Sequence, residues 1–143
     1  MTKELEQCKQ RLLTGGCTCV AQNGTDLRTT ERRGIQPLMQ WLSDGAFLRG
    51  AVVADKVIGK AAAFLLVLGG VREVYAGVIS APAAAVLETA GILYTFEKKV
   101  QNIENRQHNG ICPMESAVLQ TQDPKEAFLL LEKKCAEFQE KKS

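Results

Sequence analysis

The sequence has few aromatic residues, one histidine and no long hydrophobic run. Aromatic residues make up 6% of the 143 residues, and Trp41 is the only tryptophan. The longest apolar run, Ala61 to Leu68, is far shorter than the ~20 residues that cross a bilayer. Residues Met1 to Arg11 are polar, so they predict no signal peptide. We therefore expect a soluble cytoplasmic protein with no membrane partner.

The chain also lacks a strong charge of either sign. Its net charge is +2, and its Lys and Arg residues are interleaved with acidic residues rather than gathered into one basic stripe. A nucleic-acid-binding surface needs such a stripe, so nucleic acid is not an expected partner. The length and the 45% hydrophobic content favour a single globular domain over residues 1–143.

The chain has five cysteines. Their odd number and irregular spacing indicate free thiols rather than a disulfide framework. Cys17 and Cys19 are expected to alternate onto one face of a strand, where they pack in the core or take part in metal or redox pairing. Their spacing matches no established zinc site. We predict no metal site, and the sequence identifies no cofactor. The cysteines are Cys8, Cys17, Cys19, Cys112 and Cys135.

The chain divides into a helix capped by Thr2, an antiparallel hairpin, a second helix, and then alternating strands and helices. The hairpin is marked by Asn23-Gly24, a pair that readily takes the positive φ angles of a two-residue turn. From Ala51 onward, continuous apolar strands separated by helices are typical of a parallel sheet covered on both faces. The predicted strands are Cys17 to Gln22, Thr25 to Thr30, Ala51 to Ala54, Val74 to Ile79 and Leu93 to Phe96.

Three later helices have recognisable beginnings. The helix from Ile58 to Leu68 is apolar nearly all round, so it should be the most buried. Ser80 caps the next helix. Cys112-Pro113-Met114-Glu115 resembles a further helix start in which Glu115 reaches back to its own helix, and a last helix begins at Asp123. The fold class is α/β, a three-layer fold with a mixed sheet of about five strands covered by helices on both faces.

One segment aims polar groups at a ligand position. Residues Gly50 to Gly70, GAVVADKVIGKAAAFLLVLGG, read as a buried strand, a turn with Asp55 and Lys56, and a helix that opens with Gly59 and Lys60. The carboxyl end of a strand meeting the amino end of a helix gathers unpaired N–H groups and positive partial charge, which suits an anion. We therefore predict that these residues bind a phosphate or a carboxylate.

Each of these residues also has a structural interpretation. The alternative for Lys60 is a surface lysine, whose aliphatic stem packs on apolar side chains while its ammonium group reaches solvent. Gly59 costs about 1 kcal/mol relative to alanine inside a helix, which indicates the close approach of a ligand or of another backbone. Asp55 either caps the helix or acts as a base. The sequence leaves these alternatives open.

Cys112 is the best candidate for a nucleophile. It stands at a predicted helix start, where the helix dipole favours the reactive thiolate. The alternative is a small buried side chain in the core. His108, four residues earlier, either pairs with Cys112 as a base or metal ligand, or is a solvated loop residue.

Two segments, GAVVADKVIGKAAAFLLVLGGVREVYAGVIS and NGICPMESAV, carry a family resemblance. They resemble a small uncharacterised prokaryotic family, domain of unknown function 1893, and the resemblance covers nearly the whole chain, from Cys8 to Cys135. It implies a cytidine-deaminase-like fold and no known reaction.

The sequence departs from active zinc deaminases. Those enzymes have a His or Cys followed two positions later by a catalytic Glu, and a Pro-Cys-x-x-Cys pair at the start of the next helix. The two motifs do not occur together in this sequence, because it has no Pro-Cys-x-x-Cys pair. The resemblance places the two motif regions near Arg33-Gly34-Ile35-Gln36 and near Asp55 to Lys60, whose residues cannot build a tetrahedral zinc site. It therefore implies a pocket lined by Arg33, Gly34 and the basic turn, without zinc-dependent deamination.

Three functions remain open. The first is a non-catalytic domain that binds an anion, a nucleotide or another metabolite. The second is an enzyme that uses Cys112 as a nucleophile or redox thiol, with His108 or Lys60 adjusting its protonation. The third is a protein that assembles with itself through a sheet edge or a helix face, and the sequence leaves homodimer formation open.

Overall fold

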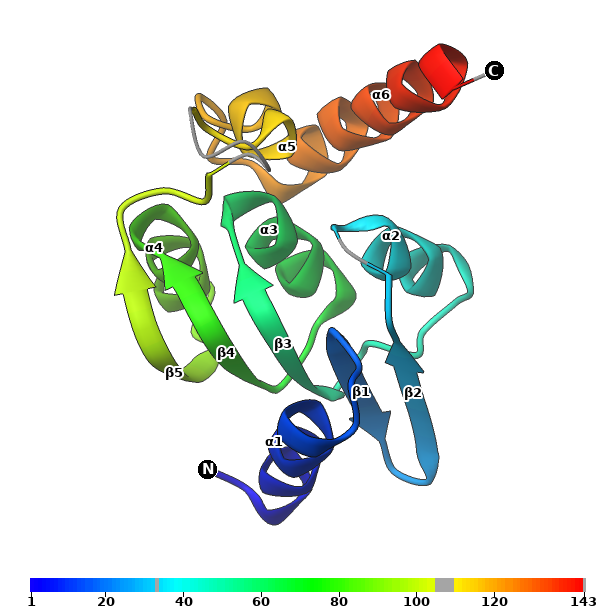
Figure 1. Ribbon diagram of the computed structural model, residues 1–143, viewed down its shortest axis with the longest axis vertical. Helices are drawn as coiled ribbons and strands as arrows, with labels where there is room; N and C mark the ends of the chain where they lie inside the picture. The colour runs from blue at the N-terminus through cyan, green and yellow to red at the C-terminus, as the bar shows by residue number, and fades with distance from the viewer. Residues whose placement is uncertain (33, 105–109, 143) are drawn as a thin grey trace.

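The computed structural model describes residues 1–32, 34–104 and 110–142. Within them the chain forms one five-stranded sheet, in the order β2-β1-β3-β4-β5, and six helices (Figure 1). The strands are β1 (Cys19–Asn23), β2 (Asp26–Thr30), β3 (Val52–Ile58), β4 (Glu73–Ser80) and β5 (Leu93–Val100). The helices are α1 (Lys3–Thr14), α2 (Gln36–Ser43), α3 (Lys60–Gly69), α4 (Ala81–Thr89), α5 (Pro113–Ala117) and α6 (Pro124–Lys142).

The sheet is mixed, as predicted. Strand β1 is antiparallel to both β2 and β3, whereas β3, β4 and β5 run parallel to one another. Four strands therefore end at the same edge of the sheet, and the arrowheads of β2, β3, β4 and β5 point the same way in Figure 1. We call this the carboxyl edge. In α/β folds this edge is where ligands bind.

The predicted hairpin is confirmed, with its turn displaced by one residue. Asn23 pairs with Asp26, so the turn consists of Gly24 and Thr25, and Gly24 has a φ of 61°. Glycine takes this conformation without steric cost. The Asn23 side chain donates to the carbonyls of Phe47 and Arg49, at 2.7 and 2.8 Å, and so fastens the hairpin to the segment before β3.

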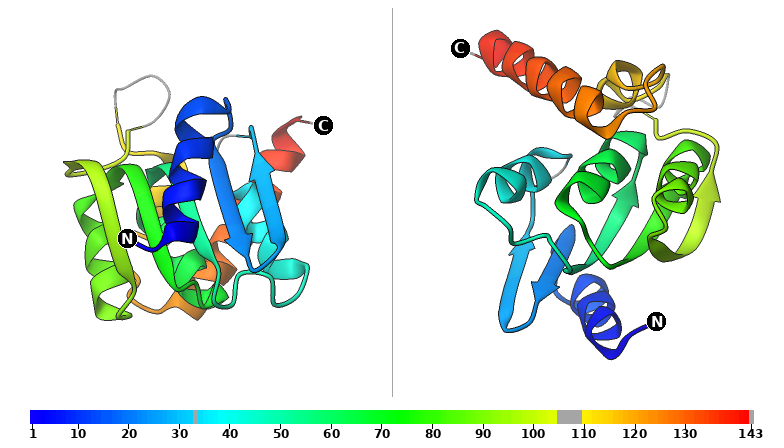
Figure 2. Two further views of the ribbon diagram at one scale, coloured as in Figure 1. Left: turned by 90° about the horizontal axis from the view of Figure 1, so that it is seen from below. Right: turned by 180° about the vertical axis from the view of Figure 1, so that it is seen from behind.

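Helices cover both faces of the sheet. On one face α1 packs through Leu5, Cys8 and Leu12 against Tyr75 and its neighbours. The other face packs against α2, α3 and α4, and α6 packs against α3. Figure 2 shows α1 crossing its face, with α3 and α4 behind the sheet. Helix α3 is buried from Lys60 to Leu66, which confirms that it is the most buried helix.

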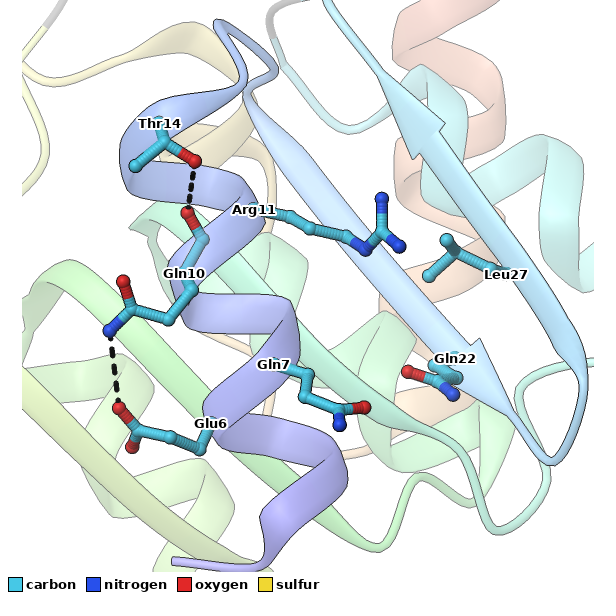
Figure 3. Close-up of a pocket in the computed structure, with 7 residues that line it drawn as sticks. All are labelled: Glu6, Gln7, Gln10, Arg11, Thr14, Gln22 and Leu27. Carbon is cyan, nitrogen blue, oxygen red and sulfur yellow. Dashed lines mark hydrogen bonds between the residues drawn. The ribbon is translucent and has the colours of Figure 1, made fainter.

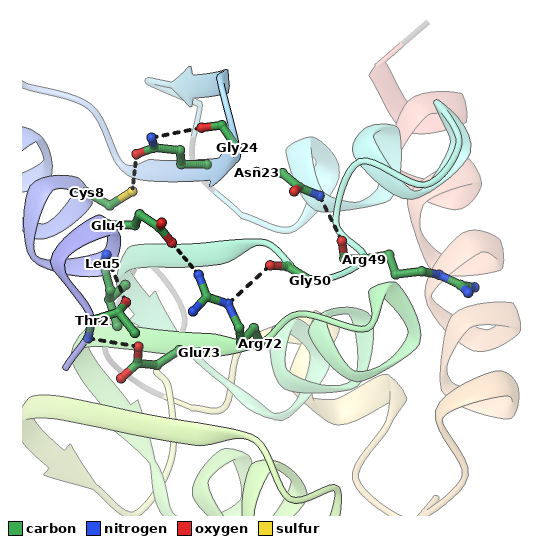
Figure 4. A network of polar contacts seen from close by, with 11 residues as sticks. Thr2, Glu4, Leu5, Cys8, Asn23, Gly24, Arg49, Gly50, Arg72 and Glu73 are labelled. Atoms are coloured by element: carbon green, nitrogen blue, oxygen red, sulfur yellow. Dashed lines mark hydrogen bonds and ion pairs between the residues drawn. The ribbon is translucent and has the colours of Figure 1, made fainter.

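Polar contacts fasten α1 to the edge opposite the carboxyl edge (Figure 4). Arg72, just before β4, forms an ion pair with Glu4 of α1. The backbone N–H of Thr2 donates to Glu73 at 3.1 Å, and the Thr2 hydroxyl accepts from the N–H of Leu5, which confirms Thr2 as the cap of α1. These contacts hold α1 against the sheet.

Two predicted boundaries near the expected site are wrong. Strand β3 runs through Ile58, so Asp55 and Lys56 lie in the strand rather than in a turn. The reason is pairing on both sides, since Asp55 lies opposite Cys19 of β1 and opposite Ala76 of β4. Helix α3 accordingly begins later than predicted, at Lys60. No helix in the described part of the chain is long and apolar enough to cross a membrane.

Candidate functional site

The N-terminus of α3 binds the carboxylate of Glu115. The N–H of Lys60 donates to Oε1 at 2.6 Å, and the N–H of Ala61 donates to Oε2 at 2.8 Å. Glu115 belongs to α5, which lies over the carboxyl edge (Figure 1). The first N–H groups of a helix have no partner within the helix and carry a positive partial charge. The N–H groups that were predicted to bind a ligand anion therefore donate to a carboxyl group of the chain itself.

Gly59 gives Glu115 the space to approach. A Cβ added at this residue would lie 2.3 Å from Oε1 and 2.5 Å from Cδ of Glu115. The φ of Gly59 is −97°, a value that any residue adopts, so the requirement for glycine is steric. The sequence predicted the close approach of a ligand or a backbone, and the approaching group is a side chain.

Lys60 holds the same segment at a second point. It is only 5% exposed, which contradicts the alternative of a lysine that reaches solvent. Its ammonium group donates to the carbonyl of Leu119 at 2.9 Å and lies 5.6 Å from the centre of the Phe64 ring. Burial lowers the pKa of Lys60, and the nearby Glu115 carboxylate acts in the opposite direction. The backbone and the side chain of Lys60 thus both bind the segment that contains α5.

Glu115 is buried together with its donors. Burial raises the pKa of Glu115, while the N–H groups of Ala61 and Lys60 and the charge of Lys60 oppose that rise. A buried carboxylate needs such charge-assisted bonds to offset its lost hydration. The prediction that Glu115 reaches back to its own helix is wrong, because its buried side chain points to the start of α3 instead.

Asp55 lies in β3 beside Cys19 of β1. Its Oδ1 accepts from the N–H of Val57 at 3.2 Å, and its carboxyl group also forms a hydrogen bond with the Cys19 thiol. Burial raises the pKa of Asp55 to about 7. Burial and the neighbouring carboxylate raise the pKa of Cys19 well above its usual value. Asp55 therefore lies within β3 and does not cap α3, so the interpretation of Asp55 as the helix cap is wrong.

The other predicted site residues lie apart from this cluster or outside the described part of the chain. Gly34 is exposed, with a φ of 88°, and Lys56 is exposed on β3. Cys112 is half-buried at the N-cap of α5, where its thiol caps no N–H group and its own N–H donates to the carbonyl of Ile103 at 3.0 Å. Arg33 and His108 lie outside the described residues.

Two shallow pockets lie beside α1, away from the predicted site. The larger has a volume of about 490 Å³ and lies between α1 and the hairpin (Figure 3). The smaller has a volume of about 300 Å³ and shares Arg11 and Thr14 with the larger. None of the predicted site residues lines either pocket. The N-terminus of α3 is thus occupied by the Glu115 side chain and lies apart from both pockets.

Cys17 and Cys19 do not share a face of the sheet. Cys17 packs under α1, whereas Cys19 packs in the core on the opposite face. The prediction of a shared face is wrong because β1 begins at Cys19, so strand alternation does not extend back to Cys17. Among the described residues, no three His, Cys, Asp or Glu side chains are grouped so that they could hold a metal ion.

A mixed sheet with helices on both faces places the chain in the α/β class. The chain belongs to the family of domain of unknown function (DUF1893), whose model matches residues 7–135. The crystal structure of a DUF1893 family protein from Thermotoga maritima is similar, with 25% sequence identity and a TM-score of 0.87, over 94% of this chain and 91% of that chain. No curated protein matches significantly. The predicted family is thereby confirmed.

Glu115 was not among the predicted site residues, although one signal pointed to a missing hydrogen-bond partner for α3. Helix α3 begins with Gly-Lys and has no side-chain cap of its own. A buried helix start of this kind requires acceptors from elsewhere in the chain. Glu115 was an acidic residue in an otherwise apolar segment and so was a candidate for that role.

Proposed function

We propose that this protein binds a small ligand with a carboxylate or phosphate group, and that the ligand binds at the N-terminus of α3. The fit of a carboxylate to this position carries the proposal. Both oxygens of Glu115 accept from successive N–H groups of Lys60 and Ala61, and Gly59 leaves the space that the carboxylate fills. In the proposed complex the ligand anion replaces the Glu115 carboxylate.

The charges around the position support an anionic ligand. Helix α3 has no acidic residue in its first turn, and its N-terminus carries a positive partial charge. The ammonium group of Lys60 adds a full positive charge and binds a neutral carbonyl, that of Leu119. A phosphate or carboxylate that reached both the N–H groups and this ammonium group would form charge-assisted hydrogen bonds.

The short helix α5 is suited to release Glu115. It has five residues, and its N-cap forms no side-chain capping bond. Such a short helix has little stability of its own. Val118, directly after α5, is fully buried and anchors the segment. We therefore propose that Glu115 and the start of α5 move while Val118 stays in place.

The test is rescue of Glu115→Ala by small anions. This substitution empties the position and leaves the N–H groups unpaired, whereas the matched control Glu115→Gln keeps it filled. Thermal unfolding is measured with acetate, propionate and inorganic phosphate, against sodium chloride at equal ionic strength. At about 100 times its dissociation constant a ligand adds about 2.7 kcal/mol, and each kcal/mol raises Tm by about 2–4 °C at this size.

We expect a saturable stabilisation of Glu115→Ala that is larger than any effect on Glu115→Gln. The comparison between the variants matters because phosphate stabilises folded proteins in general through exclusion from their surface. Equal shifts in both variants, or none with any anion, would contradict the proposal.

Catalysis by Cys112 is a second proposal. It requires Cys112 and Lys60 in one pocket, yet the Lys60 ammonium group is bonded to Leu119, and no hydrogen bond between described residues joins Lys60 to Cys112. Rapid, saturable labelling of Cys112 by a thiol reagent would support it. Labelling of Cys112 as slow as that of Cys8, whose pKa burial raises to about 11, would remove it.

A further inference from the structure

Strand β5 is an edge of the sheet with exposed apolar side chains. It follows β4 at the end of the strand order, so one row of its backbone N–H and C=O groups faces away from the sheet. Leu93 is 69% exposed and Phe96 is 42% exposed. The Tyr94 and Phe96 rings stack on one face of the strand, with centroids 6.1 Å apart. A long edge with these side chains is a template for pairing with another strand.

The second half of β5 is charged. Glu97 already has partners on its own chain, because it accepts from the Tyr75 hydroxyl at 3.3 Å and lies 3.6 Å from the ammonium group of Lys9. Lys98 and Lys99 form no ion pair with any described residue. The strand therefore has an aromatic half and a cationic half. These halves meet when the strand runs antiparallel to a copy of itself.

We infer that β5 pairs antiparallel with β5 of a second copy of this chain, in a two-fold symmetric dimer with a continuous sheet. The two-fold axis then passes between identical residues, because opposite residues must lie on the same face. An axis at Glu97 or Lys98 would set like charges opposite each other, which is unfavourable. An axis at Thr95 would pair only residues 93–97. An axis at Phe96 pairs residues 93–99 and opposes no like charges.

The register centred on Phe96 gives Lys98 interaction partners on the second copy. It places Lys98 of the second copy opposite Tyr94, whose hydroxyl donates to the carboxylate of Glu88 on α4. The lysine thus meets an aromatic ring and a carboxylate together, and symmetry repeats the contact. On the other face Lys99 lies opposite Leu93, where its aliphatic stem covers the exposed side chain. Charge and aromatic complementarity therefore favour a second copy as the partner.

The oligomeric state tests this inference. Sedimentation velocity over a range of protein concentrations compares the wild type with Phe96→Lys and with Leu27→Lys. The second variant is a matched control on β2, the other edge, where Leu27 is 37% exposed. We expect a concentration-dependent dimer for the wild type and for Leu27→Lys. Phe96→Lys sets two lysines opposite each other at the axis and should weaken the dimer at least about tenfold.

A wild type that stays monomeric at every concentration would overturn the inference. A dimer lost in Leu27→Lys and kept in Phe96→Lys would also overturn it. Circular dichroism of each variant shows whether it folds.

Cross-linking tests the register and does not depend on the folding of Phe96→Lys. Opposite residues of paired strands lie within disulfide reach, so Phe96→Cys should form a disulfide with its own copy. Lys98→Cys is the matched control, because two residues 98 would lie four positions apart, about 13 Å. We expect a 96–96 disulfide by mass spectrometry, above the background of the wild-type cysteines. Linkage through Lys98→Cys instead would overturn the inference.

Discussion

Gly59→Ala should destabilise the protein only while Glu115 is present. The added Cβ would lie between 2.3 and 2.7 Å from three atoms of the Glu115 carboxyl group, so the carboxylate must leave its position. The backbone of Gly59 is extended and accepts alanine without strain. In Glu115→Ala the same methyl group meets no carboxylate. The two substitutions should therefore be strongly coupled.

The magnitude follows from the two hydrogen bonds that would be lost. A hydrogen bond to a charged group contributes about 1.5–3 kcal/mol to stability. Because Glu115 loses its hydration on burial, we take the lower value for each of its two bonds, which gives about 3 kcal/mol in total. Alanine is a poorer N-cap than glycine by up to ~1 kcal/mol. Alanine also stabilises the folded protein by about 0.4–1 kcal/mol, because it lowers the conformational entropy of the unfolded chain. These small contributions nearly cancel. Gly59→Ala should lower the free energy of unfolding by about 3 kcal/mol in the wild type. In the Glu115→Ala background the same substitution should change it by less than ~1 kcal/mol.

The assay is a double-mutant cycle by urea unfolding near neutral pH, with the wild type, both single variants and the double variant. Gly69→Ala serves as a control, since its Cβ would meet Leu48 at 2.7 Å and has no contact with Glu115. Its cost should be the same with and without Glu115. Equal costs of Gly59→Ala in the two backgrounds would refute the reasoning.

Three further substitutions, and the control Lys56→Met, test two ionisable side chains and one helix cap. Because burial raises the pKa of Asp55 from 3.8 to about 7, the folded protein keeps a proton that the unfolded chain loses, and stability falls as pH rises through that window. Between pH 3.8 and about 7, the free energy of unfolding of Asp55→Asn should therefore rise by up to about 4 kcal/mol relative to that of the wild type. Urea unfolding over this pH range measures it, and the same pH dependence in both proteins would contradict the prediction. Lys60→Met should cost about 1–3 kcal/mol by removing the donor to a buried carbonyl, while the exposed Lys56→Met should stay within about 0.5 kcal/mol. Ser80→Ala should cost about 1 kcal/mol because a fully buried cap is lost, and thermal unfolding that shows no change in either Lys60→Met or Ser80→Ala would contradict the assigned bonds.

The elements set by neighbouring residues were predicted well. The caps Thr2 and Ser80 and the hairpin at Asn23-Gly24 act over a few residues, and the alternation of apolar strands with helices predicted a mixed sheet with helices on both faces. The end of β3 was not predicted, because Asp55 and Lys56 are typical of turns. Pairing of β3 with β1 and β4 outweighed that local preference.

The ligand predicted at the start of α3 stays a prediction, and Glu115 was not assigned to this position. The N–H groups of Lys60 and Ala61 donate to the Glu115 carboxyl group, and Glu115 is 55 residues away from Lys60 in the chain. No local pattern encodes a contact at that separation. Asp55, the nearest acid in the sequence, was the natural candidate for the cap, and its place inside β3 removed it from that role.

Amide chemical shifts of Lys60 and Ala61 test the central claim most directly. The claim is that the start of α3 is an anion-binding position that Glu115 fills in the free protein. Acetate or inorganic phosphate is titrated into isotope-labelled Glu115→Ala, with Glu115→Gln as the control. We expect saturable downfield shifts of these two amides in Glu115→Ala, because each N–H regains an anionic acceptor. Amides that stay unchanged at saturating anion would contradict it.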